Sequence, residues 1–181
     1  DNPHNITSRL VYEKRFGARN QIELVIPFGW SERSGDAGAS GNWTGGLQDV
    51  AVGLKRVLFH DLAMGTIVSF TLETILPTGD ESDGLGKGFT VFEPFATVGQ
   101  LLPMDTFVQM QAGVELPTDT EQGENEGLLR FAFGRTFNLG FEWGRAVSPM
   151  VELLGARELE DGTAVWDVMP EVHFTLNQRQ H

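Results

Sequence analysis

Cysteine is absent from this chain of 181 residues, so the protein can form no disulfide, zinc-thiolate site, thioether-linked haem or thiol nucleophile. Basic residues are few as well. Only 13 Lys and Arg stand against 25 Asp and Glu, which gives a net charge of -12. Because too few cations are available to neutralise phosphates, we expect no nucleic-acid partner.

Long hydrophobic runs are also missing. No stretch of about eighteen apolar residues occurs, which excludes a transmembrane helix. The first residues, Asp1 to His4, lack the basic and apolar regions of a signal peptide, which leaves a mature chain after signal removal or a cytoplasmic protein as the two expectations. A length of 181 residues suits one domain, so we expect a single β-barrel domain over residues 1–181.

Apolar residues alternate with polar or small residues over most of the chain, and helix signals are nearly absent. In one segment Ile22, Leu24 and Ile26 share a face, opposite Gln21 and Glu23. This period of two indicates β-strands with two chemically different faces. Nine strands of roughly 10 to 13 residues are predicted, longer than the usual length of about 5 to 6. They span residues 6–16, 19–28, 47–59, 65–77, 89–101, 106–117, 127–137, 145–157 and 163–176.

The connections between these strands alternate in length. Short links lie near Gly17, Asp61, Pro103 and Gly140, long polar loops occupy residues 31–46, 79–88 and 118–126, and a shorter loop surrounds Asp161. Long and short loops therefore segregate to opposite ends of an up-and-down sheet, as they do in outer-membrane barrels. The expected fold class is all-β: an antiparallel up-and-down β-barrel of about 8–10 long strands that spans a membrane.

Three strands end in the same pattern, in which a glutamate and a few apolar residues precede a proline. The prolines are Pro27, Pro77 and Pro117, spaced 50 and 40 residues apart. A repeat of this length corresponds to a hairpin. Because proline has no N–H for a central ladder, we expect each of the three to mark the point where strand pairing ends in a long loop at one rim.

The two faces of the predicted strands differ in a way that indicates which is inside. One face carries glutamates and small residues such as Gly53, Ser69, Gly113 and Gly134, which suit the crowded interior of a narrow barrel. The other carries large aliphatic and aromatic side chains with almost no charge, as lipid requires. We therefore expect the polar face inside. The reverse arrangement, a soluble acidic barrel with an apolar interior, also fits the alternation.

Charged residues of the polar face are the candidates for a site. No catalytic nucleophile accompanies them, and the four histidines are too scattered for a metal motif. We therefore expect no enzyme activity, no bound metal and no cofactor. The residues predicted to line the lumen and to bind a solute are Glu23, Asp49, Lys55, Glu73, Glu93, Glu115, Arg130, Glu152, Glu171 and His173.

Two acidic loop clusters and one glycine-rich segment allow other interpretations. The clusters, at residues 80–83 and 119–126, offer the carboxylate oxygens that Ca²⁺ prefers, but neither has EF-hand spacing. The segment at residues 84–88 lacks the strand-loop-helix setting and the spacing of a phosphate-binding loop. We expect solvated external loops at the clusters and a flexible hairpin loop at the segment.

Four stretches carry a resemblance to a known family: residues 21–28 (QIELVIPF), 46–55 (GLQDVAVGLK), 76–80 (LPTGD) and 84–88 (GLGKG). They are similar to a family of bacterial outer-membrane β-barrels named for transport in the meta pathway of phenol degradation. The resemblance implies a location in the bacterial outer membrane, contact with its lipid, and passage of small solutes, aromatic ones among them.

Three functions remain open at this point. They are an outer-membrane barrel whose narrow polar lumen is a pore or transport path for small solutes, a structural barrel that anchors a surface complex, and a soluble lipocalin-like carrier. Nine strands is an odd number, whereas bacterial single-chain barrels close with an even one. We therefore expect either a further strand or, at an open edge after Leu176, pairing with a partner protein or a second copy.

Overall fold

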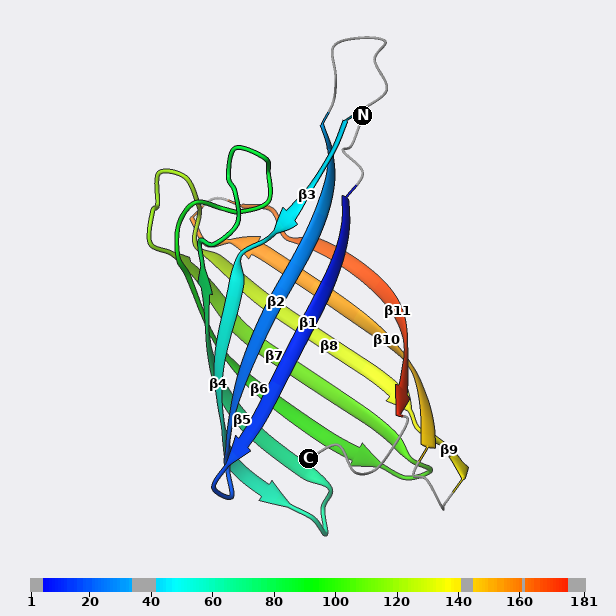
Figure 1. Cartoon of the computed structure of the whole chain (residues 1–181). Helices are drawn as coiled ribbons and strands as arrows, with labels where there is room; N and C mark the ends of the chain where they lie inside the picture. The colour runs from blue at the N-terminus through cyan, green and yellow to red at the C-terminus, as the bar shows by residue number, and fades with distance from the viewer. Residues whose placement is uncertain (1–4, 34–41, 141–144, 161, 176–181) are drawn as a thin grey trace.

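The computed structural model describes residues 5–33, 42–140, 145–160 and 162–175. Within these ranges every regular element is a β-strand, and all strands belong to a single antiparallel sheet of 11 strands (Figure 1). None of the described residues forms a helix long and apolar enough to cross a membrane. The expected all-β, up-and-down architecture is confirmed.

Nine long strands follow one another across the sheet, each paired with the next along the chain except where a short strand intervenes. They are β1 (Asn5–Phe16), β2 (Asn20–Arg33), β4 (Val50–Asp61), β5 (Thr66–Leu76), β6 (Val91–Leu102), β7 (Thr106–Pro117), β8 (Glu126–Arg135), β10 (Arg145–Glu158) and β11 (Val165–Thr175). Two short strands lie beside this path: β3 (Asn42–Leu47) pairs with β2, and β9 (Phe137–Gly140) pairs with β10.

The two short strands were not predicted, and β3 corrects the loop that was expected at residues 31–46. β2 continues to Arg33, and β3 returns beside it with Phe28 opposite Leu47. The sequence of β3, Asn-Trp-Thr-Gly-Gly-Leu, is short and rich in glycine, so it shows no clear alternation. Its pairing depends on a neighbouring strand that only the fold provides. Residues 34–41 lie outside the described part of the chain.

The proline prediction is right at two positions and wrong at one. Pro77 follows the last residue of β5, and Pro117 is the last residue of β7. Pro27 instead lies within β2, opposite Arg9 of β1. The ladder between β2 and β4 nevertheless stops at the pair Val25 and Ala51, and β2 then pairs with β3. Pro27 therefore marks a change of partner rather than the end of its strand.

Short and long connections lie at opposite ends of the sheet, as expected (Figure 1). The end formed by the tight turns after β1, β4 and β6 is called the short-turn end, and the other the long-loop end. Gly17 and Gly65 have φ angles of 63° and 69°, in the left-handed region that glycine adopts at little cost. Met104 and Asp105 occupy the same region, which makes the turn between β6 and β7 tight.

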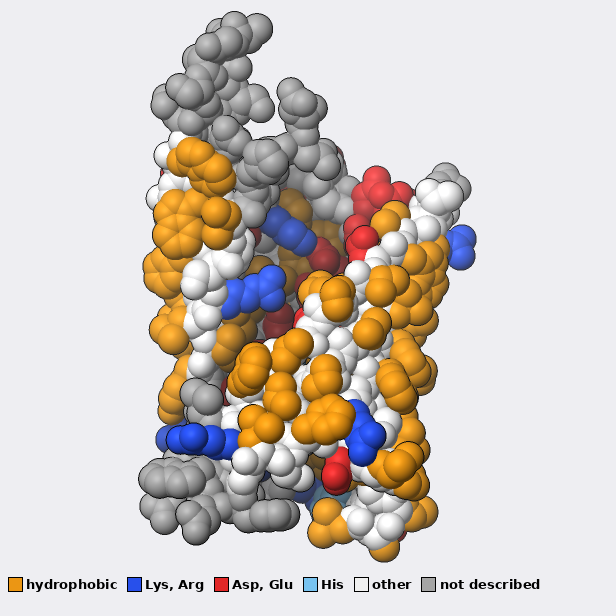
Figure 2. Space-filling view, turned by 90° about the vertical axis from the view of Figure 1, so that its right-hand side faces the viewer, with side chains coloured by type: hydrophobic (Ala, Val, Ile, Leu, Met, Phe, Trp, Pro, Cys, Tyr) orange, Lys and Arg blue, Asp and Glu red, His pale blue; other side chains and the backbone are white. Residues whose placement is uncertain are grey.

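The sheet curls so that its two edge strands, β1 and β11, approach each other across a hollow (Figures 1 and 2). Within the described residues no ladder joins them. β1 and β11 are the first and the ninth strand of this antiparallel path, so they run in the same direction. A strand that paired antiparallel with both would have to run from the short-turn end to the long-loop end.

The two faces of the sheet have the opposite polarity to those of a soluble protein. Large apolar side chains face outward and are exposed, among them Leu54 (51%), Phe70 (43%) and Val168 (68%). The buried residues are mostly small, and Ser69, Thr71 and Thr97 are among them. Figure 2 shows hydrophobic side chains over the outer surface and charged ones inside the hollow. The sheet thus encloses a polar lumen.

Candidate lumen site

Glutamates occupy successive paired positions on the inner face of the sheet. Glu13 lies opposite Glu23, Glu73 opposite Glu93, and Glu126 opposite both Glu115 and Glu158. The pairs around Glu93 and Glu115 are Phe92 with Leu116 and Phe95 with Gly113, so these two glutamates are neighbours as well. We call the set the acidic row: Glu13, Glu23, Glu73, Glu93, Glu115, Glu126 and Glu158.

The acidic row extends from one end of the lumen to the other. Glu13 lies three residues before the end of β1 at the short-turn end, whereas Glu158 is the last residue of β10 at the long-loop end. Gly53 of β4 stands between Glu23 and Glu73 and is the one position of the row without a side chain. Like charges on directly opposite residues destabilise a sheet. The row therefore requires cations or water inside the lumen.

Basic side chains from distant strands act on the acidic row. Arg9 of β1 and Arg130 of β8 both act electrostatically on the carboxylate of Glu73, which belongs to β5 midway between them in the sheet. Arg130 also acts on Glu93. Lys87, in the loop after β5, forms an ion pair with Glu115. These contacts reach across the curl of the sheet and partly neutralise the middle of the row.

The structure brings only part of the predicted set together. Glu23, Glu73, Glu93 and Glu115 belong to the acidic row, and Lys55 faces the same lumen and acts on Glu23. Arg130 faces it as well, as described above. The remaining predicted residues of the last two strands lie apart from the row.

Three of the predicted residues lie on β10 and β11. Glu152 is opposite Ala132 and Met169, and no glutamate is paired with it. Glu171 and His173 are adjacent on the inner face of β11, with their carboxylate oxygen and ring Nε2 3.1 Å apart. The two residues are separated by one position, which places both side chains on the same face of the strand. This polar pair is separate from the acidic row.

Asp49 has a role that was not anticipated. It lies in the link before β4, and its two carboxylate oxygens accept hydrogen bonds from the backbone N–H groups of Gly79 (2.9 Å) and Lys87 (2.7 Å). Leu85 in the same loop is only 5% exposed. The loop after β5 is therefore folded and held by Asp49, instead of the flexible hairpin that was expected at residues 84–88.

Some members of the acidic row were missed in the sequence, and each for a local reason. Glu13 lies in the predicted strand at residues 6–16, where apolar and polar residues alternate less regularly than in the strand at residues 19–28. Glu126 was placed in a loop cluster, although it is the first residue of β8. Glu158 lies one residue beyond the predicted strand end but is the last residue of β10. Alternation within a strand identifies the inner face, whereas the row depends on the register between strands.

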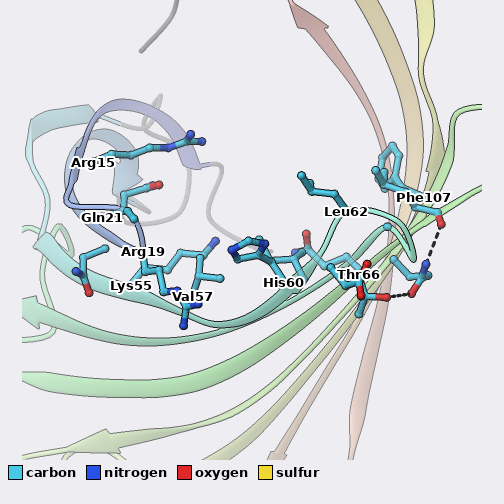
Figure 3. A pocket seen from close by; sticks show the side chains of 18 of the residues that line it. Arg15, Arg19, Gln21, Lys55, Val57, His60, Leu62, Thr66 and Phe107 are labelled. Atoms are coloured by element: carbon cyan, nitrogen blue, oxygen red, sulfur yellow. Dashed lines mark hydrogen bonds between the residues drawn. The ribbon is translucent and has the colours of Figure 1, made fainter.

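A cavity of about 650 Å³ opens at the short-turn end of the lumen. Arg15 of β1, Arg19 of the following turn and Lys55 of β4 line it together with His60 (Figure 3). The carboxylate of Asp61, which also lines it, accepts hydrogen bonds from the backbone N–H groups of residues 63 and 64. We call this the basic cavity.

A β-bulge places His60 in the basic cavity. Up to Val57, paired with Ser69, the odd-numbered residues of β4 face the lumen. The register then shifts, and Phe59 pairs with Val68 and His60 with Ile67. The extra residue at this bulge exchanges the two faces of the strand. His60 therefore faces inward, although strict alternation would have turned it toward the outer surface.

A second, smaller cavity of about 370 Å³ lies at the long-loop end. Glu124, Glu158 and Glu160 line it beside Thr120, Gly123 and Asn125, and we call it the acidic cavity. Repulsion by Glu158, together with a hydrogen bond between the two carboxyl groups, raises the pKa of Glu124. Among the residues that the structure describes, no three His, Cys, Asp or Glu side chains are placed to hold a metal ion.

Comparison with known families shows to which family the chain belongs. The model of the family described as "Putative MetA-pathway of phenol degradation" matches residues 5–153. The chain belongs to this family. The match to the MetA-pathway family runs from β1 into β10 and includes every member of the acidic row except Glu158. It also includes Arg15, Arg19, Lys55 and His60 of the basic cavity. No curated protein matches the chain.

Proposed function

We propose that this protein is an outer-membrane β-barrel of a bacterium, and that its narrow polar lumen is a pore or transport path for small solutes. The observation that carries the proposal is the inverted polarity of the sheet, with exposed apolar side chains outside and glutamates inside. Exposing so many large apolar side chains is unfavourable in water, whereas such an apolar outer face matches the hydrocarbon region of a bilayer. Outer-membrane lipid is then its principal partner.

The few charges on the outer face support the same proposal. Among the side chains that the structure describes, the register places Lys14, Arg56, Arg135 and Arg157 outward, and all four are cations. Lys14 and Arg135 lie near the short-turn end and Arg157 near the long-loop end. From these positions long basic side chains can extend to the lipid headgroups, which makes them less costly near lipid than carboxylates. Arg56 lies in the middle of β4, opposite Phe70.

The lumen suits small, hydrated solutes. The acidic row gives it a negative potential that is only partly balanced by Arg9, Lys55, Lys87 and Arg130, so we propose that it favours cations over anions. The family description supports small aromatic molecules as further solutes. The proposal includes no enzymatic reaction and no cofactor.

The edges of β1 and β11 need partners in lipid, because unpaired backbone groups are costly in hydrocarbon. We propose that a further strand, from a partner protein or a second copy where the chain itself does not supply it, pairs with these edges.

Orientation can be tested with single charges on the two faces. We expect Leu24→Arg or Phe70→Arg, on the outer face, to reduce insertion at a cost of about 2 to 4 kcal/mol each near the midplane. Gln109→Arg, on the lumen face, is the matched control and should insert normally. Insertion is measured by heat-modifiable migration of the protein in detergent micelles and vesicles.

Two further measurements separate the alternatives. A protein that stays soluble without detergent, with no loss in the Leu24 and Phe70 variants, would be a lipocalin-like carrier and would end the membrane proposal. Insertion without ion conductance in planar bilayers would leave an anchoring barrel in place of a pore.

A further inference from the structure

We propose that the basic cavity binds a small organic anion, namely a carboxylate attached to an apolar body. The site lies at the short-turn end of the lumen, and its occupation does not require the barrel to conduct. Failure of this proposal is therefore distinguishable from failure of the pore proposal.

The excess of positive charge in the lining of the cavity is the first argument. Arg15, Arg19 and Lys55 line the cavity, whereas the one acidic residue among its lining residues, Asp61, is engaged by the backbone of its own turn. The ion pairs of Lys87 with Glu115 and of Glu171 with His173 include none of the three cations. Lys55 also acts on Glu23, so the two arginines are the freer groups.

The chemistry of these groups suits a carboxylate. The planar guanidinium of arginine donates two parallel hydrogen bonds to the two oxygens of a carboxylate, and such charge-assisted bonds are among the strongest in proteins. Gln21, which also lines the cavity, offers a further amide donor. In a protein with a net charge of -12, cations gathered in one cavity create a local potential opposite to that of the remaining surface.

An apolar wall is the second argument. Figure 3 shows Arg15, Arg19 and Lys55 on one side of the cavity and Leu62 and Phe107 on the other. Leu101, which is paired with Phe107, adds to this side, and Ile67, paired with His60, also lines the cavity. An inorganic anion would contact only the basic side of the cavity, whereas an anion with an apolar body would contact both sides. The volume of about 650 Å³ lies within the range of about 300 to 1,000 Å³ that is usual for small-molecule sites.

The β-bulge of β4 is the third argument. It turns His60 into the cavity, although the regular strand would have presented this side chain to the outer face. Bulges commonly redirect a side chain beside a functional site. The imidazole adds a hydrogen-bonding group between the basic and the apolar side, as Figure 3 shows.

Four probes distinguish the parts of the proposal in calorimetric titrations of the full chain in detergent. Benzoate carries both the charge and the apolar body, benzyl alcohol only the apolar body, inorganic phosphate only negative charge, and benzylammonium the opposite charge. We expect benzoate to bind at least about tenfold more tightly than each of the other three, since each lacks one feature of the site or inverts it.

Matched variants assign the binding to the cavity. Arg15→Gln and Lys55→Gln remove inward cations, and each should weaken benzoate binding about tenfold. Their sequence neighbours face outward, so Lys14→Gln and Arg56→Gln should change it by less than about twofold. Retained heat-modifiable migration shows that each variant is folded.

Several results would overturn the proposal. One is that benzoate does not bind, and another is that the inward and outward variants lose benzoate affinity equally. Benzyl alcohol binding as tightly as benzoate would indicate a purely apolar pocket, and phosphate binding as tightly would indicate an unspecific anion site.

Discussion

The two ends of the lumen carry opposite charge. The basic cavity at the short-turn end gathers Arg15, Arg19 and Lys55, whereas the acidic cavity at the long-loop end gathers Glu124, Glu158 and Glu160. The net charge of -12 is thus distributed unevenly along the molecule. A solute in the lumen would meet a potential that changes sign between the two mouths.

The difference shows how each end is built. The basic cavity is formed by strand ends and tight turns, whose side chains are positioned by the ladder and by one bulge. The acidic cavity is formed by the loop before β8, by Glu160 and by the last residue of β10, Glu158, which also ends the acidic row. Anions are therefore expected to be held at one end, and cations to be favoured along the row toward the other.

The largest expected effect tests whether the bulge builds the basic cavity. Because the chain has no cysteine, His60→Cys and Leu58→Cys each introduce a single thiol. In reconstituted vesicles, a charged maleimide should label position 60 at least about tenfold faster than position 58, since in the proposed barrel position 60 would face the aqueous lumen and position 58 would face lipid. Mass spectrometry measures the labelled fraction. Equal rates would mean that the bulge does not redirect the strand.

A several-fold effect is expected in the middle of the acidic row. Glu73→Gln removes the carboxylate on which Arg9 and Arg130 act. The variant should reduce the preference for cations over anions several-fold, as measured by reversal potentials in planar bilayers.

Glu152→Gln is the matched control for Glu73→Gln. It removes a lumen carboxylate outside the row and should have the smaller effect on the preference for cations. An equal effect of the two variants would show that the row is not a distinct feature.

The smallest expected effect lies at the acidic cavity. Glu158 raises the pKa of Glu124 in the folded protein, so the folded state binds a proton more readily than the unfolded state. The resulting stabilisation is fully present below the ordinary pKa of glutamate and is lost as the pH rises through the raised value.

The comparison of Tm for the wild type and Glu124→Gln, from acidic to neutral pH, measures this contribution. In the variant, Tm should depend slightly less on pH. Near neutral pH its Tm should be slightly higher than that of the wild type, because the repulsion between residue 124 and Glu158 is removed. Identical pH profiles of the two proteins would mean that the carboxyl groups do not interact in solution.

Much of the architecture was predictable, because alternation within a strand depends on the sequence of that strand alone. It identified the nine long strands, the short turns and the inner positions of Glu23, Glu73 and Glu115. The acidic row depends on pairing between strands, and β3 forms only because β2 continues beside it. The bulge in β4 shifts the alternation by one residue, so the inward position of His60 could not be predicted. The backbone contacts of Asp49 are made by a loop whose sequence shows no periodicity.

The acidic row has an electrical consequence in the proposed membrane setting. Its members lie at graded depths between Glu13 near one mouth and Glu158 near the other. A transmembrane voltage acts on a unit charge with about 2.3 kcal/mol per 100 mV over the full thickness, and on each intermediate site in proportion to its depth. A cation held at successive glutamates would therefore experience successive fractions of the applied voltage. The position of a blocking ion along the row would be readable from the steepness with which voltage relieves the block.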